Sequence, residues 1–318
     1  MNPLSAIYGL AVRTSNALYD YGALPTRRLQ RPVISIGNLS VGGTGKTPFV
    51  IMLGRLLHER GIKFDVLSRG YGRTSRGVVL VDPAGSAQQF GDEPLLITRR
   101  LGVPVIIAGD RYEAGLFAEK QFGTQMHLLD DGFQHRCLAR DFDIVLFTEQ
   151  DQHDTLLPLG RLREPLAALQ RADVVVLSNF AAASVIPDKP HWHIQRGIDV
   201  PQQIPERPLV FCGIARPADF VQQLKQAGIC PIAEGFYRDH HAYSQSDIRD
   251  LISLRNKAGA GGFITTEKDA VNLGSLAGEL QPLSVIPVRM ALLDPIAAME
   301  SMLATIDARR RHETIPLT

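Results

Sequence analysis

The clearest chemical pattern in the sequence is the run Ser40-Val41-Gly42-Gly43-Thr44-Gly45-Lys46-Thr47. Its glycines let backbone N–H groups turn inward around phosphate oxygens, Lys46 can reach the β- and γ-phosphates of a nucleotide, and the Thr47 hydroxyl can ligate Mg²⁺. The pattern predicts a phosphate-binding loop, with Ser40 at the position that usually holds glycine. The alternative is a glycine-rich turn that closes a hairpin.

Neighbouring carboxylates could complete a metal site beside this loop. Asp130 and Asp131 follow an apolar run at residues 126–129, where the second Mg²⁺-organising acid of a phosphate-loop enzyme belongs. Asp92 and Glu93 precede another apolar run, and a carboxylate held there could contact Mg²⁺ or orient a base. The alternatives are local, namely a chain reversal after Asp131 and a helix cap at Asp92 or Glu93. The cap and the chemical role are compatible.

Histidines and arginines in other loops offer groups for proton transfer and anion binding. His240 and His241 stand at a break in the pattern, and one of them could act as a general base because imidazole titrates near neutrality. Surface histidines without a chemical role are the alternative. Arginines in the loops at 69–73 and 159–165 suit bidentate phosphate recognition, although surface loops often contain arginine.

Alternating strand and helix patterns must position these residues. The predicted phosphate loop lies between an apolar strand at 31–37 and an apolar helix at 48–53. Short apolar runs typical of buried parallel strands follow at residues 64–67, 78–81, 103–107, 126–129, 142–147 and 173–177. The sequence therefore predicts an α/β fold with a P-loop NTPase-like layered sheet, whose ligands bind beyond the carboxyl ends of the strands.

The length of 318 residues suggests about two domains. We expect an amphipathic helix at 1–30 and a P-loop domain at 31–180. A proline-rich linker should follow at 181–207, with a short extended ribbon at 191–195, and a smaller α/β domain at 208–318. The basic run at 309–311 is expected at a solvated end.

The first of these ranges carries an apolar repeat at helical spacing that includes Leu4, Ile7 and Leu18. The repeat is too interrupted to span a bilayer, and it lacks the features of a signal peptide. It could lie in a membrane interface, with Arg27, Arg28 and Arg31 against anionic head groups. Alternatively, it could pack on the core as an ordinary amphipathic helix.

Composition argues against several classes of function. A net charge of +1 disfavours a nucleic-acid-binding protein that relies on a basic surface. The cysteines are far apart and lack the spacing of a zinc site or a disulfide framework, so a reducing cytosol fits. The Asn-Lys-x-Asp motif of GTPases is missing, and Val41 stands where switch ATPases with a deviant loop carry a lysine.

Taken together, these motifs resemble those of the tetraacyldisaccharide 4'-kinase family, the lipid A 4'-kinases of Gram-negative bacteria. The similarity runs through nearly the whole chain, in the motifs at residues 37–47, 68–72, 91–94, 130–135, 162–165, 213–217, 239–240 and 265–270. Ser40 is the residue that the loop of this family carries.

The resemblance implies a two-domain kinase with its catalytic cleft between the domains. Its cosubstrates would be ATP and Mg²⁺, and it would transfer the γ-phosphoryl group to the 4'-hydroxyl of a lipid disaccharide 1-phosphate, giving lipid IVA. The enzyme would be peripheral to the cytoplasmic face of the bacterial inner membrane, through its N-terminal helix. Nothing in the sequence indicates a nucleic acid or an obligate protein partner.

The family's motifs also imply residue roles. Lys46 would hold the phosphates, and Asp92 would pair with His240 near the acceptor hydroxyl. Mg²⁺ would be served by Thr47, Glu93, Asp130 and Asp131. His241 lies outside the family's core pattern, so its role stays open.

Two other classes of protein stay open on the residues alone. A P-loop kinase or ligase of a soluble metabolite would not need the N-terminal helix. A non-enzymatic nucleotide-dependent switch should hydrolyse ATP slowly without an acceptor and bind a protein partner in one nucleotide state.

Overall fold

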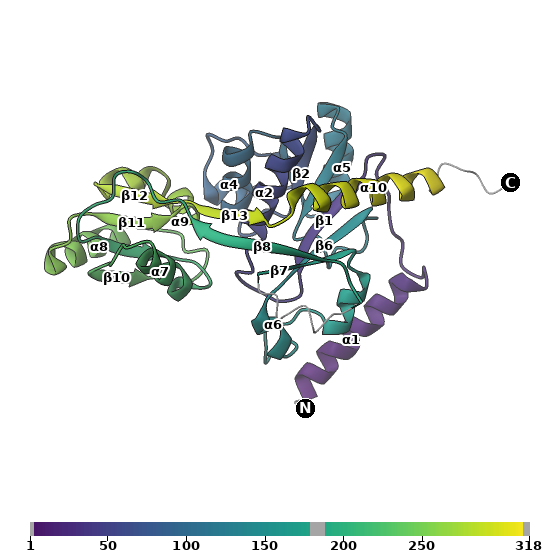
Figure 1. The fold of residues 1–318 in the computed structure, drawn as a ribbon, viewed down its shortest axis with the longest axis horizontal. Helices are drawn as coiled ribbons and strands as arrows, with labels where there is room; N and C mark the ends of the chain where they lie inside the picture. The colour runs from purple at the N-terminus through teal and green to yellow at the C-terminus, as the bar shows by residue number, and fades with distance from the viewer. Residues whose placement is uncertain (1–2, 179–187, 314–318) are drawn as a thin grey trace.

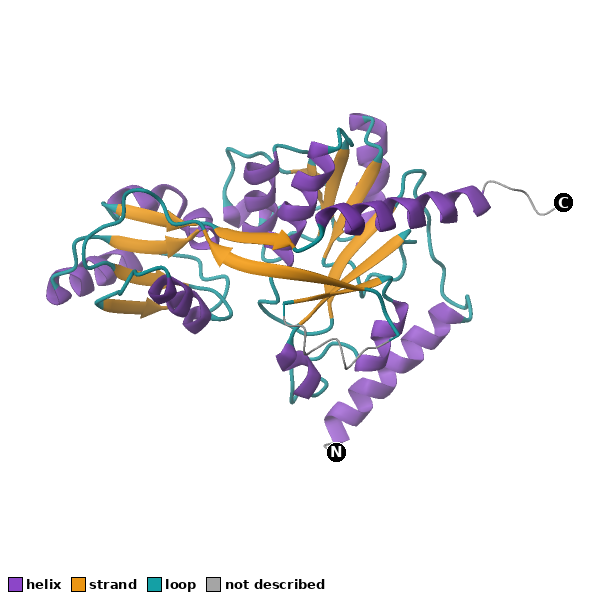
Figure 2. Ribbon diagram, viewed as in Figure 1, coloured by secondary structure: helices purple, strands orange, loops and turns teal. Residues whose placement is uncertain are grey.

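Two β-sheets of different size organise the chain (Figure 1). The structure, a computed structural model, describes residues 3–178 and 188–313. Nine strands form the larger sheet in the order β13-β8-β7-β6-β1-β5-β2-β4-β3, and four strands form the smaller one in the order β10-β9-β11-β12. Helices pack on both sheets (Figure 2), so the α/β fold class predicted from the sequence is confirmed.

Parallel strands that are buried along their whole length form the centre of the larger sheet. β1 (Val33–Asn38) lies between β5 (Met126–Asp130) and β6 (Phe142–Phe147), and β2 (Phe64–Ser68) pairs with the far side of β5. These strands lack the polar alternation of a solvated sheet because helices or loops cover both faces. The sheet is extended by β4 (Val105–Ile107), by β7 (Val174–Leu177) and by the antiparallel edge strand β3 (Val79–Leu80).

Helices on opposite faces of this sheet cover different cores. The core shared by α2 (Lys46–Glu59) and α4 (Asp92–Leu101) contains Ile34 and Ile36 of β1. The other core lies beneath α5 (Arg111–Phe122) and contains Val33 and Leu129. Shorter helices are α3 (Ala87–Phe90) and α6 (Glu149–His153). The alternation of side chains along β1 therefore supports a helix layer on each face.

A two-stranded ribbon joins the two sheets, and Figure 1 shows it running from one to the other. β8 (His191–Ile198) pairs in parallel with β7, and β13 (Val288–Leu292) pairs with β8 in antiparallel register. At the far end of the ribbon the N–H of Asp199 donates to the carbonyl of Pro287 at 2.9 Å. The segment between these two residues is thus inserted between paired strands.

The inserted segment contains the smaller sheet, whose strands are all parallel. Its strands are β9 (Leu209–Cys212), β10 (Ala233–Phe236), β11 (Phe263–Thr266) and β12 (Leu283–Ile286). The helices that accompany them are α7 (Pro217–Gln226), α8 (Gln245–Ala258) and α9 (Glu267–Leu273).

The structure divides two of the predicted ranges differently. The range 181–207, expected as a linker, contains strand β8. The sequence predicted only a short ribbon at 191–195 in this place. Residues 181–187 of the range lie outside the described part of the chain. The range 208–318 ends with β13 and α10 (Pro295–Glu313), which pack with the larger sheet. Both ribbon strands are only partly buried, so neither shows the continuous apolar run that identified the central strands.

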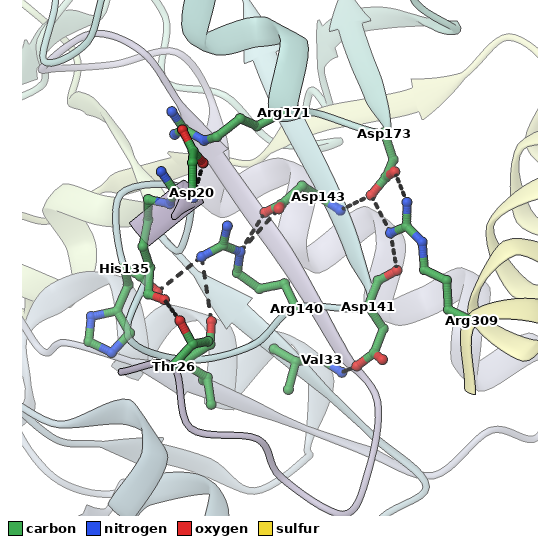
Figure 3. Close-up of polar contacts among 12 residues, drawn as sticks. Asp20, Thr26, Val33, His135, Arg140, Asp141, Asp143, Arg171, Asp173 and Arg309 are labelled. Atoms are coloured by element: carbon green, nitrogen blue, oxygen red, sulfur yellow. Dashed lines mark hydrogen bonds and ion pairs between the residues drawn. The ribbon is translucent and has the colours of Figure 1, made fainter. Parts of the chain in front are cut away.

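The basic run at 309–311 is not simply a solvated end, as the sequence suggested. Figure 3 shows Arg309 of α10 reaching Asp141 and Asp173, and its Nη1 lies 2.9 Å from a carboxylate oxygen of Asp173. Nη2 of Arg310 lies 2.8 Å from Oδ2 of Asp141, a residue that is 1% exposed. These ion pairs hold α10 across the larger sheet.

Helix α1 (Pro3–Asp20) turns polar groups toward the protein. Ser5 Oγ donates to the carbonyl of Leu156 at 3.1 Å, and Tyr8 Oη donates to the carbonyl of Arg163 at 3.0 Å. Gly9 allows a close approach, since a Cβ there would lie 2.8 Å from a methyl group of Leu156.

The opposite face of α1 is apolar and open to solvent. Leu4, Ile7 and Leu10 are 59%, 66% and 67% exposed, and Leu18 is 41% exposed. This arrangement is the reverse of an amphipathic helix that packs its apolar stripe on a core. Within residues 3–178 and 188–313, no helix has the length and hydropathy needed to cross a bilayer.

Candidate active site

The phosphate loop joins the carboxyl end of β1 to the first turn of α2. Gly42 and Gly45 have φ values of 96° and 90°, a conformation that favours glycine, and Gly45 precedes the first helical residue, Lys46. Asn38 Nδ2 donates to the carbonyl of Ser40 at 2.8 Å and fixes the start of the loop. Backbone N–H groups at the start of α2 therefore stand where a phosphate-binding loop requires them.

Lys46 lies between an amide and a carboxylate. Its Nζ donates to Oδ1 of Asn38 at 3.0 Å and lies 3.5 Å from Oδ1 of Asp131. Asp131 also accepts hydrogen bonds from both terminal nitrogens of Arg163, at 3.0 and 2.8 Å. Burial opposes ionisation of Asp131, but Lys46 and Arg163 hold its pKa well below the usual range. Asp131 is therefore an anion that orients the two cations beside the loop.

Asp130 is a buried carboxylate with one oxygen that lacks a hydrogen-bond partner among the described residues. Ser68 Oγ donates to its Oδ2 at 2.9 Å, whereas Oδ1 is buried with no hydrogen-bond partner among the described residues. Burial, and then the charges of Glu93 and Asp131, raise the pKa of Asp130 to about 7. A bound cation would relieve this unfavourable burial of charge.

The oxygen donors beside the loop are of the kind that binds Mg²⁺. Hard carboxylate and hydroxyl oxygens of Asp130, Glu93 and Thr47 line one cleft, while Asp131 is engaged by arginine and lysine. In the described part of the chain, no three His, Cys, Asp or Glu side chains form a metal cage by themselves. Mg²⁺ usually keeps several waters and binds phosphate oxygens alongside one or two carboxylates, so such a cage is not required.

Asp92 and His240 meet across the boundary between the two sheets. His240 Nδ1 donates to Oδ2 of Asp92 at 2.8 Å. Asp92 is the first residue of α4 and is 5% exposed, whereas the His240 side chain is 29% exposed. The hydrogen bond to Asp92 raises the pKa of His240 against the effect of burial. The pair can orient a hydroxyl group and hold its proton.

Lys268 joins this cluster, although no pattern in the sequence assigns it a role. Its Nζ lies 2.9 Å from Oδ1 of Asp239, 3.2 Å from Nε2 of His240 and 3.7 Å from Oε1 of Glu93. The segment 265–269 stands at a break in the sequence pattern, but only tertiary structure places its lysine beside the histidine.

His241 does not join the cluster. Its Nε2 lies 3.1 Å from Oδ2 of Asp247, and its ring stacks on Tyr237 with centroids 4.5 Å apart. The backbone of His240 has a φ of 57°, so the two neighbouring imidazoles point to different surroundings.

A single cleft of about 580 Å³ gathers most of the predicted site residues. Residues 41–47 line it from the larger sheet, together with Asp92, Glu93, Asp130 and Asp131, and His240 lines it from the inserted segment. Ser40 is buried and takes no part in the lining.

The mixed, centrally parallel sheet and its strand, loop and helix phosphate site define a P-loop NTPase-like α/β protein. The sequence profile of the family "Tetraacyldisaccharide-1-P 4'-kinase" matches residues 1–307. The chain therefore belongs to the tetraacyldisaccharide 4'-kinase family.

Individual relatives agree with this assignment. The tetraacyldisaccharide 4'-kinase of Koribacter versatilis is 47% identical over 321 residues, covering 98% of this chain and 100% of the relative. That of Geobacter metallireducens is 38% identical over 315 residues, covering 92% and 93%. The crystal structure of LpxK from Aquifex aeolicus in complex with ATP has a TM-score of 0.77 and 33% identity, covering 96% of this chain and 97% of that one.

Proposed function

We propose that this protein is an ATP-dependent kinase that transfers the γ-phosphate to the 4'-hydroxyl of a tetraacyldisaccharide 1-phosphate, giving lipid IVA. One observation carries the proposal. The phosphate loop and the Asp92–His240 pair face the same cleft from different parts of the fold, which is the arrangement that a phosphate donor and a hydroxyl acceptor require. Membership of the family supports the identity of the acceptor.

The chain's own residues account for the needs of phosphoryl transfer. The loop N–H groups and Lys46 would hold the β- and γ-phosphates, and Asp92 with His240 would orient the acceptor hydroxyl and take up its proton. Mg²⁺, held by Thr47, Glu93 and Asp130, would neutralise charge on the phosphates. Because Asp131 binds Lys46 and Arg163, we assign it to positioning these cations rather than to the metal.

The direct test is phosphate transfer from ATP labelled at the γ-position to purified tetraacyldisaccharide 1-phosphate in mixed micelles. The expected product carries the label and gains the mass of one phosphate at the 4'-position. ATP hydrolysis with no labelled lipid would instead favour a nucleotide switch. Transfer to a soluble sugar in preference to the lipid would favour a kinase of a soluble metabolite.

We propose further that α1 lies in the membrane interface at the cytoplasmic face of the bacterial inner membrane, where ATP is available. The exposed stripe of Leu4, Ile7, Leu10 and Leu18 supports this placement. Arg27 and Arg28, which the sequence placed against head groups, instead pair with Asp110 and Asp141. Their electrostatic contribution to membrane binding is therefore expected to be small.

We expect the combined replacement Ile7→Glu and Leu18→Glu to lower binding to anionic vesicles by about 100-fold, since it removes two inserted apolar side chains and adds charge. The KM for lipid should rise while the affinity for ATP stays unchanged. Vesicle sedimentation and steady-state kinetics measure these effects. The matched control is Leu293→Glu with Ile296→Glu, since these side chains are also exposed, at 54% and 64%, but lie at the other end of the chain. Equal vesicle binding by both double variants would contradict the interfacial placement.

The smaller sheet supplies His240 to a cleft whose phosphate loop belongs to the larger sheet. We propose that the inserted segment, between Asp199 and Pro287, acts as a domain that closes the cleft. Of the range 208–318 predicted for this role, only the part before Pro287 would belong to the closing domain. The predicted kinase domain at 31–180 would then bind the nucleotide, and closure would complete the site.

A further inference from the structure

The ribbon brings an arginine onto the phosphate loop. Arg196 of β8 donates a hydrogen bond from Nη2 to the carbonyl of Thr44, and its cross-strand neighbour is Met290. Gly45 makes this approach possible, because a Cβ there would lie 2.7 Å from the same nitrogen and 3.2 Å from the methyl group of Met290. The guanidinium therefore lies directly against the backbone that would surround the phosphates.

A second arginine reaches the same cleft from the smaller sheet. Arg216 precedes the first residue of α7 and lines the cleft together with Arg196. The neighbouring Ala215 lies against the loop, since a Cβ on Gly43 would be 3.0 Å from its methyl group. Arg216 thus stands at the point where the smaller domain approaches the phosphate loop.

Among the described residues, no carboxylate forms an ion pair with either guanidinium group, although Asp219 lines the same cleft. The Nε atoms of both Arg196 and Arg216 are buried with no hydrogen-bond partner among the described residues. Burial and the charge of Arg216 lower the pKa of Arg196, with Asp219 opposing the shift. Two half-buried cations whose Nε–H groups lack acceptors are stabilised when an anion lies between them.

We propose that Arg196 and Arg216 bind phosphate groups of the nucleotide, in addition to the loop and Lys46. The proposal rests on the kinase function proposed above and names two further substrate-binding residues for it. Because one arginine belongs to the ribbon and the other to the smaller domain, the nucleotide would connect three parts of the fold. Planar guanidinium groups suit this task since each can donate two parallel hydrogen bonds to one phosphate.

Two alternative roles for these arginines can be distinguished from nucleotide binding by experiment. The 1-phosphate of the acceptor lipid offers the same chemistry, so the arginines could serve that group instead. Arg196 could also act only as a support for the loop through the Thr44 carbonyl. Arg216 lines the cleft without taking part in that hydrogen bond, so its replacement separates support of the loop from phosphate binding.

The experiment measures the affinity of the full chain for ATP, ADP and adenosine by titration calorimetry without lipid, and then the KM for lipid. The variants are Arg216→Met and Arg196→Met. The control is Arg289→Met, because Arg289 lies on β13 of the same ribbon with a side chain that is 66% exposed. We expect both cleft variants to lower ATP affinity by about 10- to 100-fold, with a smaller loss for ADP and none for adenosine. The control should bind ATP as the wild type does.

Unchanged ATP affinity in Arg216→Met overturns the proposal, and so does a loss confined to the KM for lipid. If Arg216→Met does not fold, as judged by circular dichroism, Arg216→Lys and Arg216→Gln replace it, and the lysine variant should retain more ATP affinity than the glutamine variant. Equal losses in these two overturn the proposal. Absence of ATP binding in the wild type would instead overturn the kinase function itself, and the proposal with it.

Discussion

Lys46→Ala is expected to lower phosphate transfer by a factor of about 100 to 1,000 without unfolding the protein. Loss of one preorganised contact to the transferred phosphate costs roughly 3 kcal/mol of transition-state stabilisation or more. The fold should survive because the Lys46 side chain touches Asn38 and Asp131 at the cleft rather than the apolar core, and Arg163 still binds Asp131. Initial rates of labelled phosphate transfer and the thermal unfolding midpoint measure the two effects.

Thr47→Ala should reduce transfer by a similar factor, since it removes the hydroxyl assigned to the metal. Lys225→Ala is the matched control for Lys46→Ala, because Lys225 is an exposed lysine of α7 that lies outside the cleft. Its phosphate transfer should equal that of the wild type. Near-normal turnover by Lys46→Ala would exclude the assignment of residues 40–47 as a phosphate-binding loop.

The second large effect concerns the pair formed by Asp92 and His240. Asp92→Ala and His240→Ala should each lower kcat by about 100-fold or more while the KM for ATP changes little, since neither side chain is assigned to the nucleotide. The hydrogen bond of 2.8 Å between them makes them act as one unit. The double variant should therefore lose little more activity than the worse single variant.

His241→Ala is the internal control for this pair. This neighbouring histidine bonds to Asp247 and does not line the cleft, so its removal should leave kcat near the wild-type value. Independent, multiplicative losses at Asp92 and His240 would show that the two residues are not coupled, and a large loss at His241 would contradict the assignment of His240.

The phosphate loop was accessible to sequence reasoning because its chemistry is local. A strand, a glycine-rich turn and a helix start follow one another along the chain, so the residues between 40 and 47 carry the whole signal. The central strands were also predictable, since burial on both faces leaves continuous apolar runs.

Other parts of the site arise only from contacts between distant segments. Lys268, Arg196 and Arg216 reach the cleft from different elements. Arg216 and Lys268 lie in the motifs at 213–217 and 265–270, but the motifs alone did not assign either residue a role. The neighbouring Asp130 and Asp131 looked equivalent as metal ligands, but Arg163 engages the second and leaves an oxygen of the first without a partner among the described residues.

The orientation of α1 also could not be predicted from the sequence. Its apolar periodicity indicates a helix, yet periodicity cannot say which face meets the protein. The polar contacts of Ser5 and Tyr8 decide that question, because they turn Ile7 and Leu10 to solvent.

The ribbon that carries the inserted segment also orders events during synthesis. β13 and α10 follow the inserted segment in the chain, yet β13 is the edge strand of the larger sheet, and its Met290 and Leu292 pack in the main core with Trp192 of β8. The inserted segment has its own sheet and begins and ends at the contact between Asp199 and Pro287, so it can fold as soon as it leaves the ribosome. We therefore expect the larger domain to begin folding before the inserted segment and to finish after it, and the apolar side of β8 to stay exposed in the nascent chain until β13 has been made.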